Sequence, residues 1–171
     1  SEGLLFMAAC HPVFSDAEER FTLSANFPGV ARKIIKDTKG ISRTMFLQGT
    51  AGDINPLDSP EFVTGEKLAN EVMEVIDGSM QRVTGSLSHY LDTVTLEVPI
   101  RSKEDIIAYS HDAKINENGM LKERNHTWEQ IMLGYLNKGM KQFPMPVYVH
   151  TLNIGNWKLV GFSRETTTPY G

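Results

Sequence analysis

Short apolar runs alternate with amphipathic segments in the first half of the chain. The unbroken apolar run 4–10 ends at His11-Pro12 and predicts a strand that is buried on both faces. In the segment 28–38 the apolar positions fall on one side of a helix. A second short strand is expected at 43–47, followed by a polar loop and a long helix that opens at Ser59-Pro60, with the serine as its cap. This alternation favours a layered α/β domain.

The second half contains patterns of exposed strands. Apolar and polar residues alternate over 94–100, which predicts a strand with one exposed face at the edge of a sheet or on its outside. The segments 147–154 and 157–162 flank Gly155-Asn156, a pair of turn-forming residues, and so predict a hairpin.

Two helices are expected between these strands. Ser102 can cap a helix that runs through about Ala113. Thr127-Trp-Glu-Gln130 has the spacing of a capping box and predicts that the next helix begins there, after a polar loop at 116–125. The expected fold class is therefore α/β, with mixed β-sheets covered by α-helices.

Composition narrows the class of protein. With 171 residues, of which 40% are hydrophobic, residues 1–171 are expected to form a single domain with one sizeable core. The net charge of −4 is not gathered into a block, so nucleic acid is not an expected partner.

The lone Cys10 is read as a small apolar residue. No apolar stretch reaches the roughly 18 residues of a spanning helix, and no signal peptide is apparent at Ser1.

Polar residues follow three of the expected strands. They are His11, the loop 52–55 and Glu165, and strand ends are where α/β proteins usually gather ligand sites. The loop 52–55 also has an ordinary explanation. Gly52 can form a tight turn, and the polar residues after it can form hydrogen bonds to their own backbone. The short signatures of zincins, Cys-x-x-Cys metal sites, nucleophile elbows and phosphate loops are absent from the sequence. Spacing alone therefore assigns no chemistry.

Four motifs occur in the order that is seen in the neutral ceramidase family, and the chain most resembles the bacterial ceramidase-like relatives. They are His11-Pro12, Ser24-Ala-Asn-Phe-Pro-Gly29, Phe46-Leu-Gln-Gly-Thr-Ala-Gly-Asp-Ile-Asn-Pro56 and Leu159-Val-Gly-Phe-Ser-Arg-Glu-Thr-Thr167. Together they span nearly the whole chain. The resemblance implies the central part of a larger ceramidase-like catalytic domain, located in the periplasm or secreted.

The resemblance also implies a zinc site and a substrate. The family holds Zn²⁺ with two histidines, a glutamate and a tyrosine, and hydrolyses N-acylsphingosine to a fatty acid and sphingosine. By motif position, His11 resembles the second histidine and Glu165 the glutamate. The other two ligands are expected before Ser1 and after Gly171, since Tyr170 is too close to Glu165 to match the family's tyrosine. Two ligands are fewer than the three of a typical catalytic zinc, so we expect the chain alone to bind zinc weakly or not at all.

The chain departs from the family at two positions. Asn55 replaces a serine, so the role of that serine is not carried over, although an amide can donate a hydrogen bond to a substrate carbonyl or oxyanion. Arg164 places a bulky cation beside Glu165 where the family has glycine. We therefore expect Asn55 as a catalytic candidate, with Gly52 and Asp53 on the substrate-binding side.

Other readings stay open at this point. Asn55 and Arg164 favour a relative in the same fold that hydrolyses another amide or ester. A binding or structural domain that kept the fold and lost the metal is the second alternative. The expected ligand in the leading reading is a small-molecule or lipid amide, and an exposed sheet edge can join two copies into a homodimer.

Overall fold

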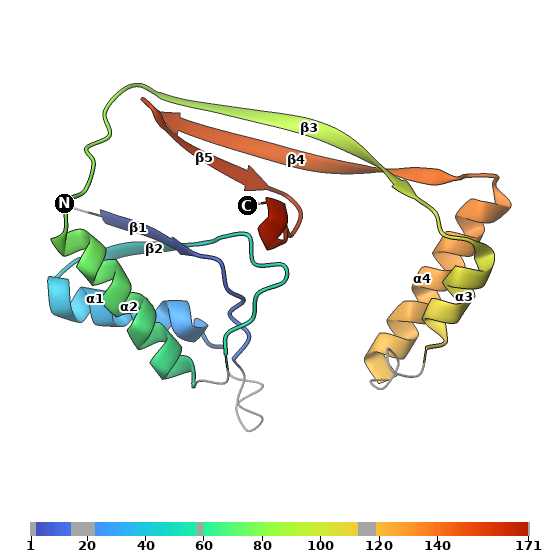
Figure 1. The fold of residues 1–171 in the computed structure, drawn as a ribbon, viewed down its shortest axis with the longest axis horizontal. Coiled ribbons are helices and arrows are strands. Elements are labelled where there is room, and N and C mark those ends of the chain that lie inside the picture. The colour runs from blue at the N-terminus through green and yellow to red at the C-terminus, as the bar shows by residue number, and fades with distance from the viewer. Residues whose placement is uncertain (1–2, 15–22, 58–59, 113–118, 171) are drawn as a thin grey trace. The chain divides into compact units, whose positions relative to one another are not determined.

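The chain forms two compact units in a computed structural model that describes residues 3–14, 23–57, 60–112 and 119–170 (Figure 1). One unit combines residues 1–88 with 152–171, and the other consists of residues 89–151. The described residues form four helices and two small sheets, which confirms the α/β class. Whether residues 1–171 form a single domain within a larger catalytic domain stays a prediction. None of the described helices combines the length and the apolar character that crossing a membrane requires.

The first unit begins with a βαβα arrangement. Strand β1 (Gly3–Ala8) leads to α1 (Asn26–Lys39), β2 (Arg43–Gln48) and α2 (Glu61–Asp77). The two strands are parallel neighbours, with Gly3 opposite Arg43 and Ala8 opposite Gln48. Because parallel strands end on the same edge, this pairing places the segments after β1 and β2 side by side.

The core of this unit lies between β1 and the two helices. Phe6 of β1 packs with Ala31 and Ile35 of α1 and with Ala69 of α2, all four of them buried. On the opposite side of β1, Leu5 is 45% exposed and Met7 is 60% exposed. The prediction of a strand buried on both faces is therefore wrong for this structure, because the buried contacts of β1 are on the side of Phe6.

Both helices start near the expected positions, and α1 also stops where expected. Helix α1 ends at Gly40, whose φ of 69° is the left-handed conformation that glycine adopts easily. Pro60 directly precedes the first residue of α2 instead of lying in its first turn. The expected cap Ser59 lies outside the described residues.

The second sheet has the strand order β3-β4-β5. The edge strand β3 (Leu87–Pro99) confirms the expected edge position and begins well before residue 94. Strands β4 (Gln142–Ile154) and β5 (Trp157–Phe162) confirm the hairpin, and Gly155 turns it with a φ of 57°. Strands β3 and β4 each belong in part to both units.

The second unit also contains two helices. Ser102 caps α3 (Lys103–Ser110) by accepting a hydrogen bond from the Asp105 N–H, as expected. The helix is shorter than predicted, and Ala113 lies outside the described residues. Tyr109 of α3 packs edge-to-face on Trp128 of α4 (Gly119–Asn137), with ring centroids 5.2 Å apart.

The predicted start of that last helix at Thr127 is wrong. Thr127 lies inside α4, where its hydroxyl donates to the carbonyl of Glu123 at 3.1 Å. This bond to the preceding turn is the alternative that threonine has to capping. The predicted loop 116–125 is likewise helical from Gly119 onward, and its first three residues lie outside the described part.

Candidate functional site

Three segments of the first unit are joined by backbone hydrogen bonds beyond the ends of β1 and β2. The His11 N–H donates to the Ile54 carbonyl at 3.0 Å, and the Gly49 N–H donates to the Ala8 carbonyl at 2.9 Å. From the other end of the chain, the Thr166 carbonyl accepts from the Gly52 N–H at 2.9 Å. The loop after β2 is therefore held on one side by the segment after β1 and on the other by the segment after β5.

This arrangement brings together three of the five predicted site residues. His11 Nδ1 lies 3.2 Å from Asn55 Oδ1, and His11 Nε2 is in hydrogen-bonding contact with Glu165 Oε1. His11 and Glu165 are separated by 154 positions in the sequence. The side chain of His11 is 24% exposed and that of Glu165 is 67% exposed, so the cluster is open to solvent.

The partners of His11 favour its protonated form. The Asn55 side-chain oxygen is an acceptor, so a hydrogen bond to it needs a proton on His11 Nδ1. The other ring nitrogen faces the Glu165 carboxylate, so a protonated imidazole can donate to both partners. The hydrogen bond to Glu165 is the main cause that raises the pKa of His11 above its ordinary value, with the charge of Glu165 and the bond to Asn55 acting in the same direction and partial desolvation opposing them.

The other two predicted residues hold the segment that carries Glu165. Asp53 accepts a hydrogen bond from the Thr168 N–H at 2.8 Å and another from the Thr168 hydroxyl at 2.9 Å. These bonds, the backbone one first, lower the pKa of Asp53. A Cβ at Gly52 would lie 3.1 Å from the Thr166 oxygen, so glycine permits this close approach. A substrate-binding role for Gly52 and Asp53 stays a prediction.

Sequence reasoning did not identify two residues that support this cluster. Thr168 is the partner of Asp53, and the Gln48 side chain donates to the Cys10 carbonyl at 2.9 Å, which fixes the backbone just before His11. The Thr166-Thr-Thr168 run after Glu165 was the available signal for the first, since threonine offers both a backbone and a side-chain donor. Burial raises the pKa of the Cys10 thiol, which suits a packing role better than a nucleophilic one.

The donor types at the cluster suit zinc, but their number is small. An imidazole nitrogen and a carboxylate oxygen are common zinc ligands, and here they point at each other from two chain segments. Within the ranges that the structure describes, no group of three or more His, Cys, Asp or Glu side chains is arranged to hold a metal ion. His11 and Glu165 therefore fit as two members of a larger ligand set.

Comparison of the chain with models of protein families, with curated proteins and with solved structures finds no match. Assignment to the neutral ceramidase family therefore rests on the four sequence motifs and stays a prediction. The fold provides one observation that does not depend on that resemblance. A histidine, an asparagine and a glutamate meet at the ends of β1, β2 and β5.

Proposed function

We propose that the chain belongs to a zinc-dependent amide hydrolase of the neutral ceramidase type, with a ceramidase-like α/β catalytic domain. Its substrate would be an N-acylsphingosine. Hydrolysis adds water across the amide, so that the acyl carbon gains the hydroxyl, the nitrogen gains the proton, and fatty acid and sphingosine separate. The observation that supports the proposal most is the contact between His11 Nε2 and Glu165 Oε1, the two side chains that motif position assigns to one metal.

Each residue of the cluster has a distinct task in this proposal. His11 and Glu165 would hold zinc, which when bound polarises a carbonyl and makes water more acidic. Asn55 would keep the proton of His11 on Nδ1, which leaves Nε2 with its lone pair, and such outer partners orient metal-binding histidines. The amide nitrogen of Asn55 remains a donor for a substrate carbonyl.

A rigid loop is a further requirement that this chain meets. Asp53 and Gly52 bind the segment 166–168 through three hydrogen bonds, so Glu165 is held by its immediate neighbours. Holding catalytic groups within a narrow range of positions accounts for much of the rate gain in enzymes. The proposed role of Gly52 and Asp53 is thus to position Glu165, alongside any contact with substrate.

A related hydrolase of another amide or ester is the second candidate. The observation that favours it is the use of the Asn55 oxygen by His11 at the position where the family carries a serine. A hydroxyl can both donate and accept through one atom, whereas an amide divides these functions between two atoms. The geometry offered to the substrate therefore differs from that of a serine enzyme.

The test combines metal content and turnover of the full-length protein. His11→Ala and Glu165→Ala should each lose zinc and the hydrolysis of N-acylsphingosine. Asn55→Ala should retain part of the zinc and lose about 10-fold to 100-fold in affinity or activity, as the loss of an outer partner does. His126→Ala is the matched control, because His126 is an exposed histidine that bonds to Gln130 in α4.

The outcomes of this test distinguish the ceramidase-type enzyme, the related hydrolase and the binding or structural domain. Full zinc occupancy and turnover in both ligand variants would show that the metal assignment is wrong. Zinc without activity on N-acylsphingosine, together with hydrolysis of other amides or esters, would favour the second candidate. An unmodified protein that takes up no zinc at neutral pH would leave the binding or structural domain as the remaining reading.

A further inference from the structure

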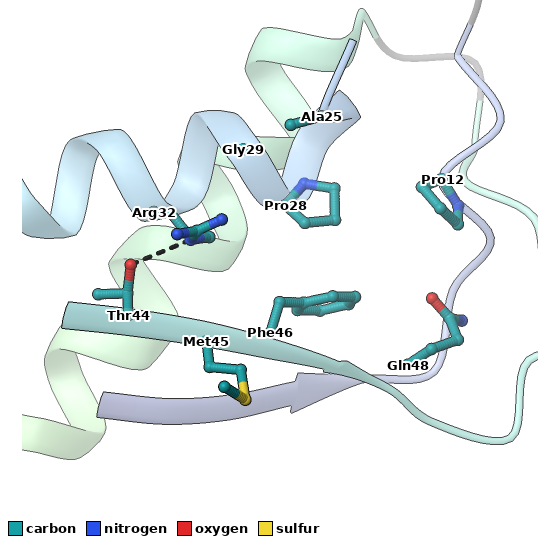
Figure 2. A pocket seen from close by; sticks show the side chains of 9 residues that line it. All are labelled: Pro12, Ala25, Pro28, Gly29, Arg32, Thr44, Met45, Phe46 and Gln48. Atoms are coloured by element: carbon teal, nitrogen blue, oxygen red, sulfur yellow. Dashed lines mark hydrogen bonds between the residues drawn. The ribbon is translucent and has the colours of Figure 1, made fainter. Parts of the chain in front are cut away.

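A groove of about 570 Å³ runs between the first turns of α1 and strand β2 (Figure 2). This volume lies within the usual range of small-molecule pockets. The residue before α1 and residues of its first two turns contribute at spacings of three and four positions, which share one face, and β2 contributes mainly alternate residues. The lining residues are Pro12, Ala25, Pro28, Gly29, Arg32, Thr44, Met45, Phe46 and Gln48.

The middle of the groove is apolar. Figure 2 shows the ring of Pro28 facing that of Phe46 across it. Phe46 is fixed by edge-to-face contacts with Phe6 and Phe27, at centroid distances of 5.5 and 6.1 Å. A Cβ at Gly29 would lie 2.6 Å from the Cβ of Ala25, so the helix wall is restricted to small residues there. These apolar walls suit a hydrocarbon chain.

One end of the groove carries a positive charge. Arg32 is the single ionisable side chain among the described residues that line it. Its Nε donates to the Thr44 hydroxyl at 3.1 Å, which uses one of the five N–H donors of the guanidinium and fixes its direction. The remaining donors form the planar fork that binds carboxylates with two parallel hydrogen bonds.

The other end of the groove is formed in part by the residue that follows His11 in the chain. Pro12 and Gln48 line this end, opposite Arg32 and Thr44 in Figure 2. Pro12 directly follows His11, and Gln48 bonds to the carbonyl of Cys10, which precedes it. From Thr44 to Gln48 the strand advances about 13 Å, at roughly 3.3 Å per residue. A ligand that fills the groove is thus long enough to separate its two ends by several methylene groups.

We propose that this groove binds an unbranched acyl chain that ends in a carboxylate, with the carboxylate on Arg32 and the opposite end beside His11. Arg32 is exposed at this end, so its guanidinium can donate hydrogen bonds to a carboxylate, whereas a terminal methyl group accepts none. This inference deepens the proposed function and rests on it in one respect: the amide to be hydrolysed lies at the His11 end. The substrate class is then an N-acylsphingosine whose acyl chain ends in a carboxylate.

The test measures binding and does not require turnover. Decanedioic acid monoamide and decanamide are compared as probes by NMR titration of the full chain. The carboxylate probe should bind at least about tenfold more tightly, as expected for a charge-assisted pair. Arg32→Gln should remove this preference and leave the affinity for decanamide unchanged. Lys36→Gln is the control, because Lys36 is an exposed cation of α1 that does not line the groove.

Two further variants distinguish the pocket from a surface charge effect. Thr44→Val removes the acceptor that orients Arg32 and should reduce the preference for the carboxylate probe while the charge stays. Ala25→Leu adds bulk to an exposed position in the groove wall and should weaken both probes. Circular dichroism of each variant verifies that the fold is kept.

The results also separate this inference from the proposed function. Equal binding of the two probes, or an unchanged preference in Arg32→Gln, overturns the carboxylate site even if the protein contains zinc and hydrolyses N-acylsphingosine. A preference that depends on Arg32 supports the groove even if the zinc and turnover tests fail.

Discussion

The partners of His11 are compatible with two protonation states of its imidazole, with and without a proton on Nε2. Its two ring nitrogens face Asn55 and Glu165, and a protonated imidazole can donate to both. Removal of the proton on Nε2 would leave two electron-donating groups, the imidazole nitrogen and the carboxylate, facing the same point. The hydrogen bond to Asn55 is compatible with both states, because it needs only the proton on Nδ1.

The pKa of His11 in the metal-free chain is the first test at this scale. Glu165→Gln should lower it toward the ordinary value of 6.5, because the largest cause of the upward shift is lost. Asn55→Ala should lower it by less. NMR titration of the ring protons measures the value, and Glu123→Gln, an exposed carboxylate in α4, should leave it unchanged. A His11 pKa that is the same with and without Glu165 would contradict the hydrogen bond.

The sign of the stability effect follows from the direction of this shift. The folded state binds the His11 proton more tightly than the unfolded chain does, so the pair stabilises the fold fully below the unfolded pKa of about 6.5. This contribution is lost as the pH rises through the higher pKa of the folded state. The difference in stability between wild type and Glu165→Gln should therefore be larger at pH 5 than at pH 9.

Asp53 gives a second test, in which the contribution to stability depends on pH in the opposite direction. Its pKa is lowered by Thr168, so its contribution is present above the unfolded value of 3.8 and is lost as the pH falls through the lower folded value. Asp53→Asn should accelerate hydrogen exchange of the Thr168 amide, because the amide side chain keeps one acceptor and loses the charge. Asp92→Asn is the control, since Asp92 lies in β3 in the other unit. Unchanged exchange at Thr168 would show that Asp53 does not hold this segment.

At the scale of elements, α1 and α2 approach closely because α2 has small residues at the crossing. A Cβ at Gly65 would lie 2.5 Å from Val30 Cβ and 2.8 Å from the carbonyl oxygen of Phe27. Ala69, one turn later, is fully buried. The short side chains let the two helices pack closely together over Phe6.

Gly65→Ala is therefore expected to destabilise the protein although alanine favours helices. Overpacking of this kind costs about 1–3 kcal/mol, which exceeds the gain of about 1 kcal/mol in helix propensity. Urea unfolding measures the change. Gly134→Ala in α4 is the matched control, since nothing lies within 4 Å of its Cβ, and it should be neutral or slightly stabilising. Val30→Ala combined with Gly65→Ala should recover part of the loss, whereas additive destabilisation would contradict a direct clash.

Elements were predicted well where local chemistry determines them. The strand 43–47, the hairpin around Gly155-Asn156 and the Ser102 cap all depend on patterns within a few residues, and each is confirmed. Thr127 misled the prediction, because the capping-box spacing also occurs inside a helix, where the hydroxyl bonds to the preceding turn. The exposure of Met7 depends on what packs on the sheet, which a run of apolar residues does not reveal.

The candidate site could be predicted from the sequence only in part. His11, Asn55 and Glu165 were selected through the order of motifs, because their separations carry no periodic signal. Their contact requires the parallel pairing of β1 with β2 and the return of the chain through β5, which are long-range features. The anchoring of Thr168 by Asp53 could not be predicted for the same reason.

At the scale of the whole molecule, the first unit consists of residues 1–88 and 152–171, and residues 89–151 are inserted between these two segments. Among the described residues the first sheet has only the strands β1 and β2, and homodimerisation through an edge of such a sheet stays a prediction. The insertion raises a more direct question, namely whether the His11 cluster needs the second unit in order to form.

We expect the cluster to form without the second unit. The Asn153 side chain donates to the Ser88 hydroxyl at 3.3 Å, so the two ends of the insertion lie side by side, and an Asn-Gly turn can replace residues 89–151. Shortening this connection lowers the entropy cost of bringing Glu165 to His11. The shortened protein should therefore keep the raised His11 pKa in an NMR titration, and Glu165→Gln in the same background should lower it. An ordinary pKa for His11 in a shortened protein that still folds cooperatively would show that residues 89–151 are required to build the site.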